Sequence, residues 1–436
     1  MSGPLTAEQH RWRYRIFAVT WVGYAGFYLC RKNFSVCMPM LTHDLGYSKT
    51  DFAHIIALYS LMYALGQFYN GILNDRFGPR LIVTIGHVIA LACSVVMGFG
   101  HVYAVFFVFY VLNGVGQSTG WSGTVKNMAT WFRHRERGVV MGYWCTCYVL
   151  GGLAATNFAT WAATNELLFP QLGWRRGFWA PAIALAVVSA LYVVFTRNKP
   201  SDAGLPDFPE DDDAPVSYGA PVPVREEVPF WDVFKEVYSK PVIWLTGGTY
   251  FLVKATRYAF IFWLPLYLSQ ALAYSDAKSG YMSSVYEFVG FFGVILAGYL
   301  SDKVWNSRRF PITSIMLFGL AAACFIHPHL AGLGTVGCAV GIGLIGMMTF
   351  GPDAIMSGPA AQDMGSQRGA AMAAGIINGL GSFGQIISPY IVALIADSKY
   401  GWNGVFYLFV VFAIVSGGLM ATLWNYGGHQ PAASAR

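Results

Sequence analysis

Apolar stretches long enough to cross a bilayer recur along most of the 436-residue chain, from Ile16 to Trp424. A helix of about 20 apolar residues spans the hydrocarbon core of a membrane. Only 11% of the residues are charged, against roughly 25% in soluble domains. This pattern excludes an ordinary soluble enzyme and predicts an all-α membrane protein. The twelve predicted spans are 16–40, 52–73, 81–99, 103–124, 138–161, 178–196, 242–269, 279–300, 311–328, 331–354, 369–396 and 403–424.

Basic residues are distributed unevenly over the tails and loops that flank these spans. If the N-terminus lies inside, eighteen Lys and Arg lie on that side of the membrane and five lie on the opposite side. Lys and Arg are enriched in cytoplasmic loops of membrane proteins. We therefore predict that both termini are cytoplasmic. The basic loops are interpreted as topology signals, and no nucleic-acid partner is expected.

The only long polar segment lies between spans six and seven. It is rich in Pro, Gly and acidic residues and includes the run Glu210–Asp213. Such a composition cannot build a packed core. We predict a cytoplasmic linker at 197–241 between two six-helix bundles, at 1–196 and 242–436.

Several features of the first bundle recur in the second at an offset of 226 to 228 residues. Nearly constant offsets indicate an internal duplication of six spans, and repeats of this kind place the substrate between the halves, near the membrane midplane. We therefore predict two pseudo-symmetric bundles. The repeated pairs are Gly71 and Gly298, Asp75 and Asp302, Gly173 and Gly401, and Arg31 and Arg257.

Arg31 and Arg257 lie inside predicted spans, where an ionised side chain is costly and is found mainly where it faces a cavity and binds something. Tyr24 and Tyr28 precede Arg31 at helical spacing and share its face. Lys254 and Tyr258 lie beside Arg257 in the same way. A guanidinium suits phosphate or carboxylate. These residues are predicted to bind an anionic substrate; structural ion pairs with acids of neighbouring helices are the alternative for both arginines.

Glu287 is a carboxylate in span eight, which is also predicted to be buried. A buried carboxylate is tolerated only with a partner. We predict that Glu287 pairs with a basic residue when substrate is absent. An anion that reached Arg257 would then compete with Glu287 and loosen one gate.

The segment after span two reads Gly71-Ile-Leu-Asn-Asp75-Arg76-Phe-Gly78-Pro-Arg80 and resembles the loop signature of the major facilitator superfamily. We expect its glycine to allow close helix approach, and Asp75 to form charge-assisted bonds with basic residues that close the cytoplasmic side. A plain stop signal of turn residues and positive charge is the alternative. The predicted gating residues are Asp75, Arg76, Arg80, Asp302, Lys303 and Lys126; gating or structural pairing is also predicted for Asp353.

A second resemblance rests on span one, which reads Tyr28-Leu-Cys-Arg31-Lys32-Asn33-Phe34-Ser-Val-Cys-Met38-Pro39. This segment closely resembles the signature of the organophosphate:phosphate antiporters, which include bacterial glycerol-phosphate and hexose-phosphate transporters and their sensor relatives. The resemblance covers nearly the whole chain, with further matches at Gly120-Trp121, Arg135-Glu136-Arg137-Gly138 and Phe350-Gly351-Pro352. It implies a bacterial inner-membrane protein whose Arg31 and Arg257 bind phosphate. It also implies that Tyr24, Tyr28 and Glu287 belong to the pocket or its switch.

Four positions depart from the pattern of that group. Gln67 stands where the glycerol- and hexose-phosphate transporters have a lysine, and Cys147 where the family usually has a histidine. Lys254 stands where the glycerol-phosphate member has a tyrosine, and Asp353 replaces an apolar residue. We therefore include Gln67, Cys147 and Lys254 in the predicted substrate-binding set. The phosphate clamp is expected to be kept, with a different organic moiety attached to it.

Together these features predict a monomeric transporter that exchanges an organic phosphate ester for inorganic phosphate by alternating access. Two alternatives stay open: a membrane sensor of sugar phosphate with the same fold, and a proton-coupled symporter of an organic anion in which Glu287 or Asp353 carries the proton. The sequence shows no nucleophile–base pair, no metal-ligand cluster and no glycine loop that cradles phosphate. No enzymatic activity, cofactor or bound metal is therefore expected.

Overall fold

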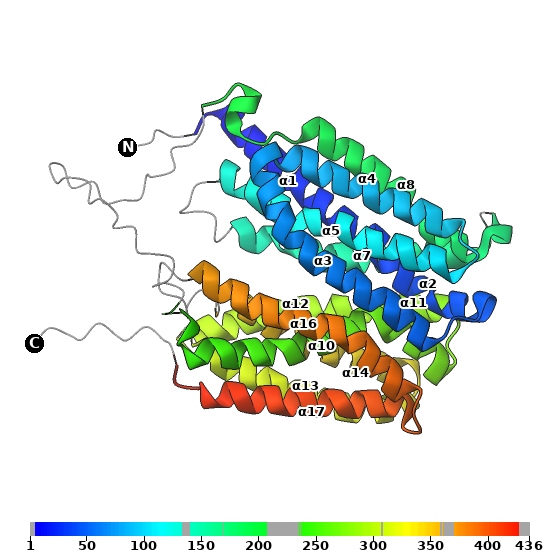
Figure 1. Ribbon diagram of the computed structural model, residues 1–436. Helices are drawn as coiled ribbons and strands as arrows, with labels where there is room; N and C mark the ends of the chain where they lie inside the picture. The colour runs from blue at the N-terminus through cyan, green and yellow to red at the C-terminus, as the bar shows by residue number, and fades with distance from the viewer. Residues whose placement is uncertain are drawn as a thin grey trace, which may run out of the picture. The chain divides into compact units, whose positions relative to one another are not determined.

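The computed structural model describes residues 5–132, 140–167, 169–206, 235, 237–306, 308–357, 360 and 370–426. Every regular element in these ranges is helical, which confirms the all-α prediction. The chain forms two compact units (Figure 1). The first unit comprises Met1–Leu45 and Leu58–Glu227, and the second comprises Gly46–Ala57 and Val228–Arg436. Helix α3 (Lys49–Phe77) therefore begins in the second unit and continues into the first.

Two sequence predictions fall mostly outside the described residues. The acidic run Glu210–Asp213, with most of the linker at 197–241, is one of them. The motif at 135–138 is the other. The division of the chain at that linker therefore stays a prediction.

The first unit consists of helices that pack mainly against α5 and α8. Helix α4 contacts both α5 and α8, α2 contacts α7 and α8, and α1 contacts α5, α7 and α8. Thr6 begins α1 with a capping box, because its hydroxyl accepts from the Gln9 amide while the Gln9 side chain accepts from the Thr6 amide. The helices are α1 (Ala7–Phe27), α2 (Leu29–Leu45), α3, α4 (Pro79–Gly98), α5 (Tyr103–Trp131), α7 (Thr146–Thr164) and α8 (Arg176–Phe195), with 3-10 helices η1 (Pro170–Arg175) and η2 (Pro200–Ala203).

The second unit is built around α10 and α14. Helix α10 packs against α16 and α17, while α14 packs against α12 and α13 (Figure 1). The first turn of α3 also belongs to this unit, where Lys49 Nζ lies 2.7 Å from Asp397 Oδ1. The helices are α10 (Pro241–Leu272), α11 (Asp276–Ser283), α12 (Val285–Lys303), α13 (Arg309–Gly332), α14 (Thr335–Ser357), α16 (Ala370–Ala396) and α17 (Gly401–Thr422).

The internal repeat predicted from the sequence is visible in the backbone of each unit. Helix α3 begins at Lys49 and α11 begins at Asp276, 227 residues later. Gly173 precedes α8 with φ of 49°, and Gly401 begins α17 with φ of 55°. Both glycines adopt the left-handed conformation that other residues rarely take. The repeats differ at their first helix, because the regular α-helical pattern is interrupted at the single residue Tyr28, between α1 and α2, whereas α10 is continuous.

Eight of the described helices are long and apolar enough to cross a membrane: α4, η1 with α8, α10, α11 with α12, α13, α14, α16 and α17. The other predicted spans correspond to α1 with α2, α3, α5 and α7. These four contain more polar side chains, among them Arg31 and Lys32 in α2 and Asn113 and Gln117 in α5. Buried polar groups thus weaken the apolar signal of these spans, although α10, α12 and α14 pass the same criterion while burying Lys254, Glu287 and Asp353.

The prediction that glycine in the Gly71–Arg80 segment allows close approach fails at Gly71, where within the described structure a Cβ would meet no atom within 4 Å, as at its repeat Gly298. At Gly78 of the same segment a Cβ would lie 2.5 Å from Asn198 Nδ2. Close approach occurs deeper in the bundles instead. A Cβ at Gly293 would lie 2.2 Å from Met347 O, and one at Gly384 would lie 2.1 Å from Phe251 O. Gly71 and Gly298 lie near the C-terminal ends of α3 and α12, where no neighbouring helix comes as close.

Candidate functional site

The break between α1 and α2 is held by polar side chains of α5. Tyr110, Asn113 and Gln117 are spaced three and four residues apart and so share one face of that helix. Their donors reach carbonyls at the break: the Tyr110 hydroxyl donates to Arg31 O at 3.0 Å, Asn113 Nδ2 to Cys30 O at 2.7 Å, and Gln117 Nε2 to Phe27 O at 2.9 Å. Buried carbonyls need such partners. The face therefore fixes the backbone that carries Arg31.

The guanidinium of Arg31 is buried, with 5% of the residue exposed. Its Nε donates to Gln117 Oε1 at 3.1 Å, and its Nη2 has no hydrogen-bond partner. Its central carbon lies 4.6 Å from the centre of the Tyr28 ring and 5.1 Å from that of Tyr63. Among the described residues, no carboxylate pairs with it. The first unit thus buries a positive charge for which the described structure shows no carboxylate partner.

The other residues of this unit that were predicted to bind substrate differ in how deeply they are buried. Tyr24 is buried, 5.3 Å from the Trp121 ring and 5.7 Å from the Trp144 ring. Cys147 is fully buried in the same apolar cluster as Tyr24 and Trp144. Gln67 is half-buried on α3, one helical turn after Tyr63. Tyr28 contacts Arg31 directly, whereas Cys147 contributes to the core packing behind Tyr24.

In the second unit Arg257 is paired with a carboxylate. Its Nη1 lies 2.7 Å from Asp353 Oδ2, and both side chains are largely buried. The Tyr250 hydroxyl donates to Asp353 Oδ1 at 3.2 Å. The guanidinium carbon also lies 4.7 Å from the centre of the Phe350 ring and 5.7 Å from that of Tyr258. The two arginines are therefore related in sequence but differ in electrostatic environment.

Two more charged groups lie in this cluster. Lys254 Nζ donates to Asn378 Oδ1 at 3.3 Å and lies 4.9 Å from the centre of the Tyr250 ring. Lys254 and Asp353 also interact electrostatically. Glu287, on α12, is buried with 4% of the residue exposed. The cluster thus gathers two cations and two carboxylates from α10, α12 and α14.

Two residues that contact Arg31, Gln117 and Tyr63, were not predicted from the sequence. Asp353 was predicted to serve in gating or structural pairing, and its bond to Arg257 is an ion pair of the kind given as the alternative for the arginines. The polar residues at 110, 113 and 117 interrupt an apolar span at helical spacing, which is a signal for a buried polar face. Asp353 was noted, but the carboxylate expected to compete for Arg257 was Glu287.

The predicted gating residues form pairs near one end of each unit. Asp75 Oδ1 lies 2.6 Å from Lys126 Nζ, which also donates to Asn74 O at 3.0 Å. Arg80 instead bonds Val193 O through its Nε. In the second unit, Asp302 pairs with Arg309 of α13. Arg76 and Lys303 are exposed. Asp75 and Asp302, the acids of the repeated motif, thus form ion pairs between neighbouring helices of their own units.

Comparison with known protein families identifies the superfamily of this chain. The family model of the Major Facilitator Superfamily matches residues 20–374. The chain belongs to this superfamily. A solved structure of a bacterial homologue of the human lysosomal transporter Spinster, in an inward-facing and unoccupied conformation, has a TM-score of 0.79 at 14% identity, covering 97% of this chain and 99% of that one. The major facilitator fold with twelve transmembrane helices in two six-helix bundles is thereby confirmed.

Curated relatives within the superfamily match along the whole chain. The glycerol-3-phosphate transporter of Bacillus subtilis is 27% identical over 431 residues, covering 98% of this chain and 95% of that protein. A probable hexose phosphate transport protein of Chlamydia trachomatis is 28% identical over 443 residues, covering 98% and 94%. These matches confirm the resemblance to the organophosphate:phosphate antiporters. The protein is an integral membrane protein of a transporter family, not of an enzyme family.

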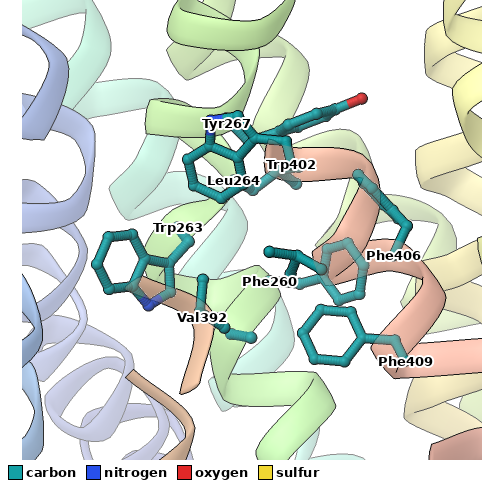
Figure 2. A pocket seen from close by; sticks show the side chains of 10 residues that line it. Phe260, Trp263, Leu264, Tyr267, Val392, Trp402, Phe406 and Phe409 are labelled. Atoms are coloured by element: carbon teal, nitrogen blue, oxygen red, sulfur yellow. The ribbon is translucent and has the colours of Figure 1, made fainter. Parts of the chain in front are cut away.

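A cavity in the second unit of this major facilitator protein lies apart from the charged groups. Its volume is about 20 Å³, and it is lined by Phe260, Trp263, Leu264, Tyr267, Val392, Trp402, Phe406 and Phe409, with Ala259 and Val405 (Figure 2). This cavity has room for about one water molecule and is therefore too small for a phosphate ester. Within the described residues no group of three His, Cys, Asp or Glu could hold a metal ion. The arginine clusters are therefore the candidate functional site.

Proposed function

We propose that this protein transports an organic phosphate ester, such as glycerol phosphate or a sugar phosphate, in exchange for inorganic phosphate. One observation carries the proposal: Arg31 is buried, its Nη2 lacks a hydrogen-bond partner, and its partners are neutral. A buried charge without a counter-ion is strongly unfavourable. A bound anion supplies that counter-ion.

The guanidinium of Arg31 suits a phosphate group. The guanidinium presents N–H donors in a fixed fork that matches two oxygens of a phosphate group. The rings of Tyr28 and Tyr63 flank the guanidinium and leave its charge uncompensated. The names of the relatives, transporters of glycerol 3-phosphate and hexose phosphate, support a phosphate ester as the substrate.

We infer that Arg257 is the second phosphate-binding residue, because it occupies the equivalent position in the repeat. Tyr24, Tyr28, Tyr258, Gln67, Cys147, Lys254 and Glu287 complete the proposed substrate-binding set, either in the pocket or behind it. The organic moiety is proposed to meet Gln67 and Lys254, since both positions depart from the pattern of the related transporters.

Exchange follows from the charge of the site. Ester and inorganic phosphate carry the same anionic group, so one set of arginines serves both in turn. A carrier that buries the guanidinium of Arg31 without a counter-ion changes state poorly when empty, and a bound phosphate relieves that cost. We propose that a phosphate gradient drives ester uptake through a monomer in the bacterial inner membrane, with both termini cytoplasmic. The pairs Asp75–Lys126 and Asp302–Arg309 are proposed to act in gating.

Reconstitution into liposomes tests this function. Vesicles loaded with inorganic phosphate are expected to take up labelled glycerol 3-phosphate or glucose 6-phosphate, and empty vesicles to take up little. Arg31→Gln is expected to abolish uptake. Uptake of some other anion, with no uptake of any phosphate ester, would refute the proposal. Ester binding without exchange would instead favour a membrane sensor, and uptake driven by a pH gradient without internal phosphate would favour a proton-coupled symporter.

A further inference from the structure

The start of α1 and the end of α8, which pack against each other, are joined by basic and aromatic side chains. The guanidinium carbon of Arg15 lies 4.5 Å from the centre of the Trp12 ring and 5.8 Å from that of Phe195. The guanidinium carbon of Arg197, just after α8, lies 5.6 Å from the same Trp12 ring. Trp12 itself stacks on Trp131, with 5.9 Å between the ring centres. Two guanidinium groups, one from each segment, therefore contact one indole ring.

Further positive charge lies next to these two arginines, and the α1–α8 basic cluster comprises Arg11, Arg15, Arg197 and Lys199. Arg11 precedes Arg15 by one helical turn and shares its face of α1. Lys199 follows Arg197 by two residues, and Arg197 Nη1 donates to Val194 O at 3.0 Å. The side chains of Arg11, Arg15 and Lys199 are exposed and form no hydrogen bond or ion pair in the described part of the chain. Three of the four cations are thus available to a ligand.

The carboxylates of the same two segments do not neutralise this cluster. Glu8 is exposed in the first turn of α1. Asp202 of η2 accepts from the backbone amide of Asn198 at 3.2 Å through its Oδ2. Neither acid forms an ion pair with the cluster in the described structure. A fifth cation, Arg13, is buried with its guanidinium carbon 4.6 Å from the centre of the Phe132 ring. The two segments therefore keep an excess of positive charge.

The cluster lies where both helices are predicted to enter the membrane. Predicted span one begins at residue 16, and predicted span six ends at residue 196. Trp12 therefore lies at a membrane–water boundary, where Trp is enriched and long basic side chains reach the lipid headgroups. On the membrane side of the cluster, α8 exposes an apolar face formed by Leu191, Val194 and Phe195. A lipid whose headgroup lay at the cluster would place its acyl chains against this face.

We propose that the α1–α8 basic cluster binds the headgroup of an anionic phospholipid, such as phosphatidylglycerol, with the acyl chains along that face of α8. A guanidinium that stacks on an aromatic ring still donates from its edge to the oxygens of a phosphodiester. Basic pockets between transmembrane helices on the cytoplasmic side bind acidic headgroups, and the proposed topology puts the cluster on that side. A free phosphate would satisfy the charges but leave the apolar face uncovered. This inference goes beyond the proposed function and does not depend on the transported substrate.

Lipid binding by the wild-type protein is the first test. The full-length protein, purified in a mild detergent, is mixed with equal amounts of phosphatidylglycerol and phosphatidylcholine that carry the same acyl chains. Bound lipids are then counted by native mass spectrometry. Both lipids contain a phosphodiester, but only phosphatidylglycerol has a net negative charge. Phosphatidylglycerol is expected to bind on the order of 10-fold more than phosphatidylcholine, because several basic residues add to its affinity.

Substitutions separate the cluster from net charge. Arg11→Gln combined with Arg15→Gln removes two exposed cations and is expected to lower the binding of phosphatidylglycerol on the order of 10-fold. Lys235→Gln combined with Arg308→Gln removes the same charge from exposed positions of the second unit, and this matched control is expected to bind like the wild type. Trp12→Leu keeps every charge but removes the shared ring, and binding is expected to fall about threefold. If Trp12→Leu does not fold, the two double variants still decide the question.

Several outcomes would overturn the proposal. Equal binding of the two lipids by the wild type would show that no anionic lipid is selected. An equal loss in both double variants would show that net charge alone explains the binding, and the cluster would then be only a topology signal. Glycerophosphoglycerol, which is the headgroup without its chains, is added in large excess and is expected to displace little lipid. Complete displacement would mean that the ligand is a soluble phosphodiester.

The acidic run Glu210–Asp213 is the other anion that the chain itself offers to this cluster. Replacing Glu210 by Gln and the three aspartates by Asn is expected to leave the binding of phosphatidylglycerol unchanged. A marked rise would mean that this run occupies the cluster in place of a lipid, which would overturn the proposal. None of these outcomes bears on the transport of a phosphate ester, so the two proposals fail independently.

Discussion

The neutral side-chain amide of Gln117 accepts a hydrogen bond from the guanidinium of Arg31. Its Oε1 accepts from Arg31 Nε at 3.1 Å, while its Nε2 donates to Phe27 O at 2.9 Å. The amide therefore connects the guanidinium to the last carbonyl of α1 without compensating its charge. In the second unit the corresponding arginine meets Asp353 instead. Because Gln117 is neutral, the guanidinium of Arg31 has no counter-ion until an anion binds.

Gln117→Glu should weaken phosphate binding. The new carboxylate acts as an internal anion on Arg31 and competes with the ligand, so the affinity for glycerol 3-phosphate is expected to fall at least about tenfold. Equilibrium binding at pH 8 measures the effect, since the carboxylate is then most fully ionised. Gln171→Glu, at an exposed position of η1, adds the same charge to the same unit and is expected to have no effect. Unchanged affinity in Gln117→Glu would contradict the proposed role of Arg31.

Arg31→Lys tests the fork of donors separately from the charge. Lysine keeps one positive charge but cannot donate to Gln117 and bind two phosphate oxygens in the same plane. Uptake of glycerol 3-phosphate is expected to fall on the order of 100-fold, about 2.7 kcal/mol. Arg175→Lys, at the end of η1, where the side chain contacts His101 and not Arg31, is the control and should transport normally. Near-normal transport by Arg31→Lys would show that charge alone suffices.

Much of this architecture could be predicted because the bilayer imposes a strong signal on the sequence. Apolar runs of the right length mark the spans, and the repeated anchors mark the duplication. Arg31 and Arg257 stand out for the same reason, since charges inside apolar runs are rare. The break at Tyr28 could not be predicted, because the apolar pattern continues across it and its carbonyls are satisfied from α5.

The partner of Arg257 was harder to predict than Arg257 itself. The sequence offers two carboxylates, Glu287 and Asp353, and only the packing of α14 against α10 shows that Asp353 reaches Arg257 Nη1. The same applies to Asp75. Its nearest basic residues in sequence are Arg76 and Arg80, but the described ion pair joins it to Lys126 on α5. Sequence distance is a poor guide to contacts between helices.

Exchanging the charges of Asp75 and Lys126 tests whether their pairing is what matters. The two side chains are partly exposed, so losing the pair should cost under about 1 kcal/mol of stability. Asp75→Lys and Lys126→Asp are each expected to slow exchange several-fold without changing the affinity for phosphate. The double variant should recover at least half of the wild-type rate, measured by counterflow in liposomes. A double variant as slow as either single one would argue against a role for the pair in gating.

Two glycines of α12 should respond differently to the same substitution. A Cβ at Gly293 would lie 2.2 Å from Met347 O, a backbone atom that can move only if α12 and α14 separate. Gly293→Ala is therefore expected to destabilise the protein by about 1–3 kcal/mol. A Cβ at Gly298, in the repeated motif, would meet nothing within 4 Å in the described structure, and Gly298→Ala should be neutral or slightly stabilising. Thermal unfolding of the two purified variants in the same detergent measures the difference. Equal losses in both would show that Gly298 has a close neighbour after all.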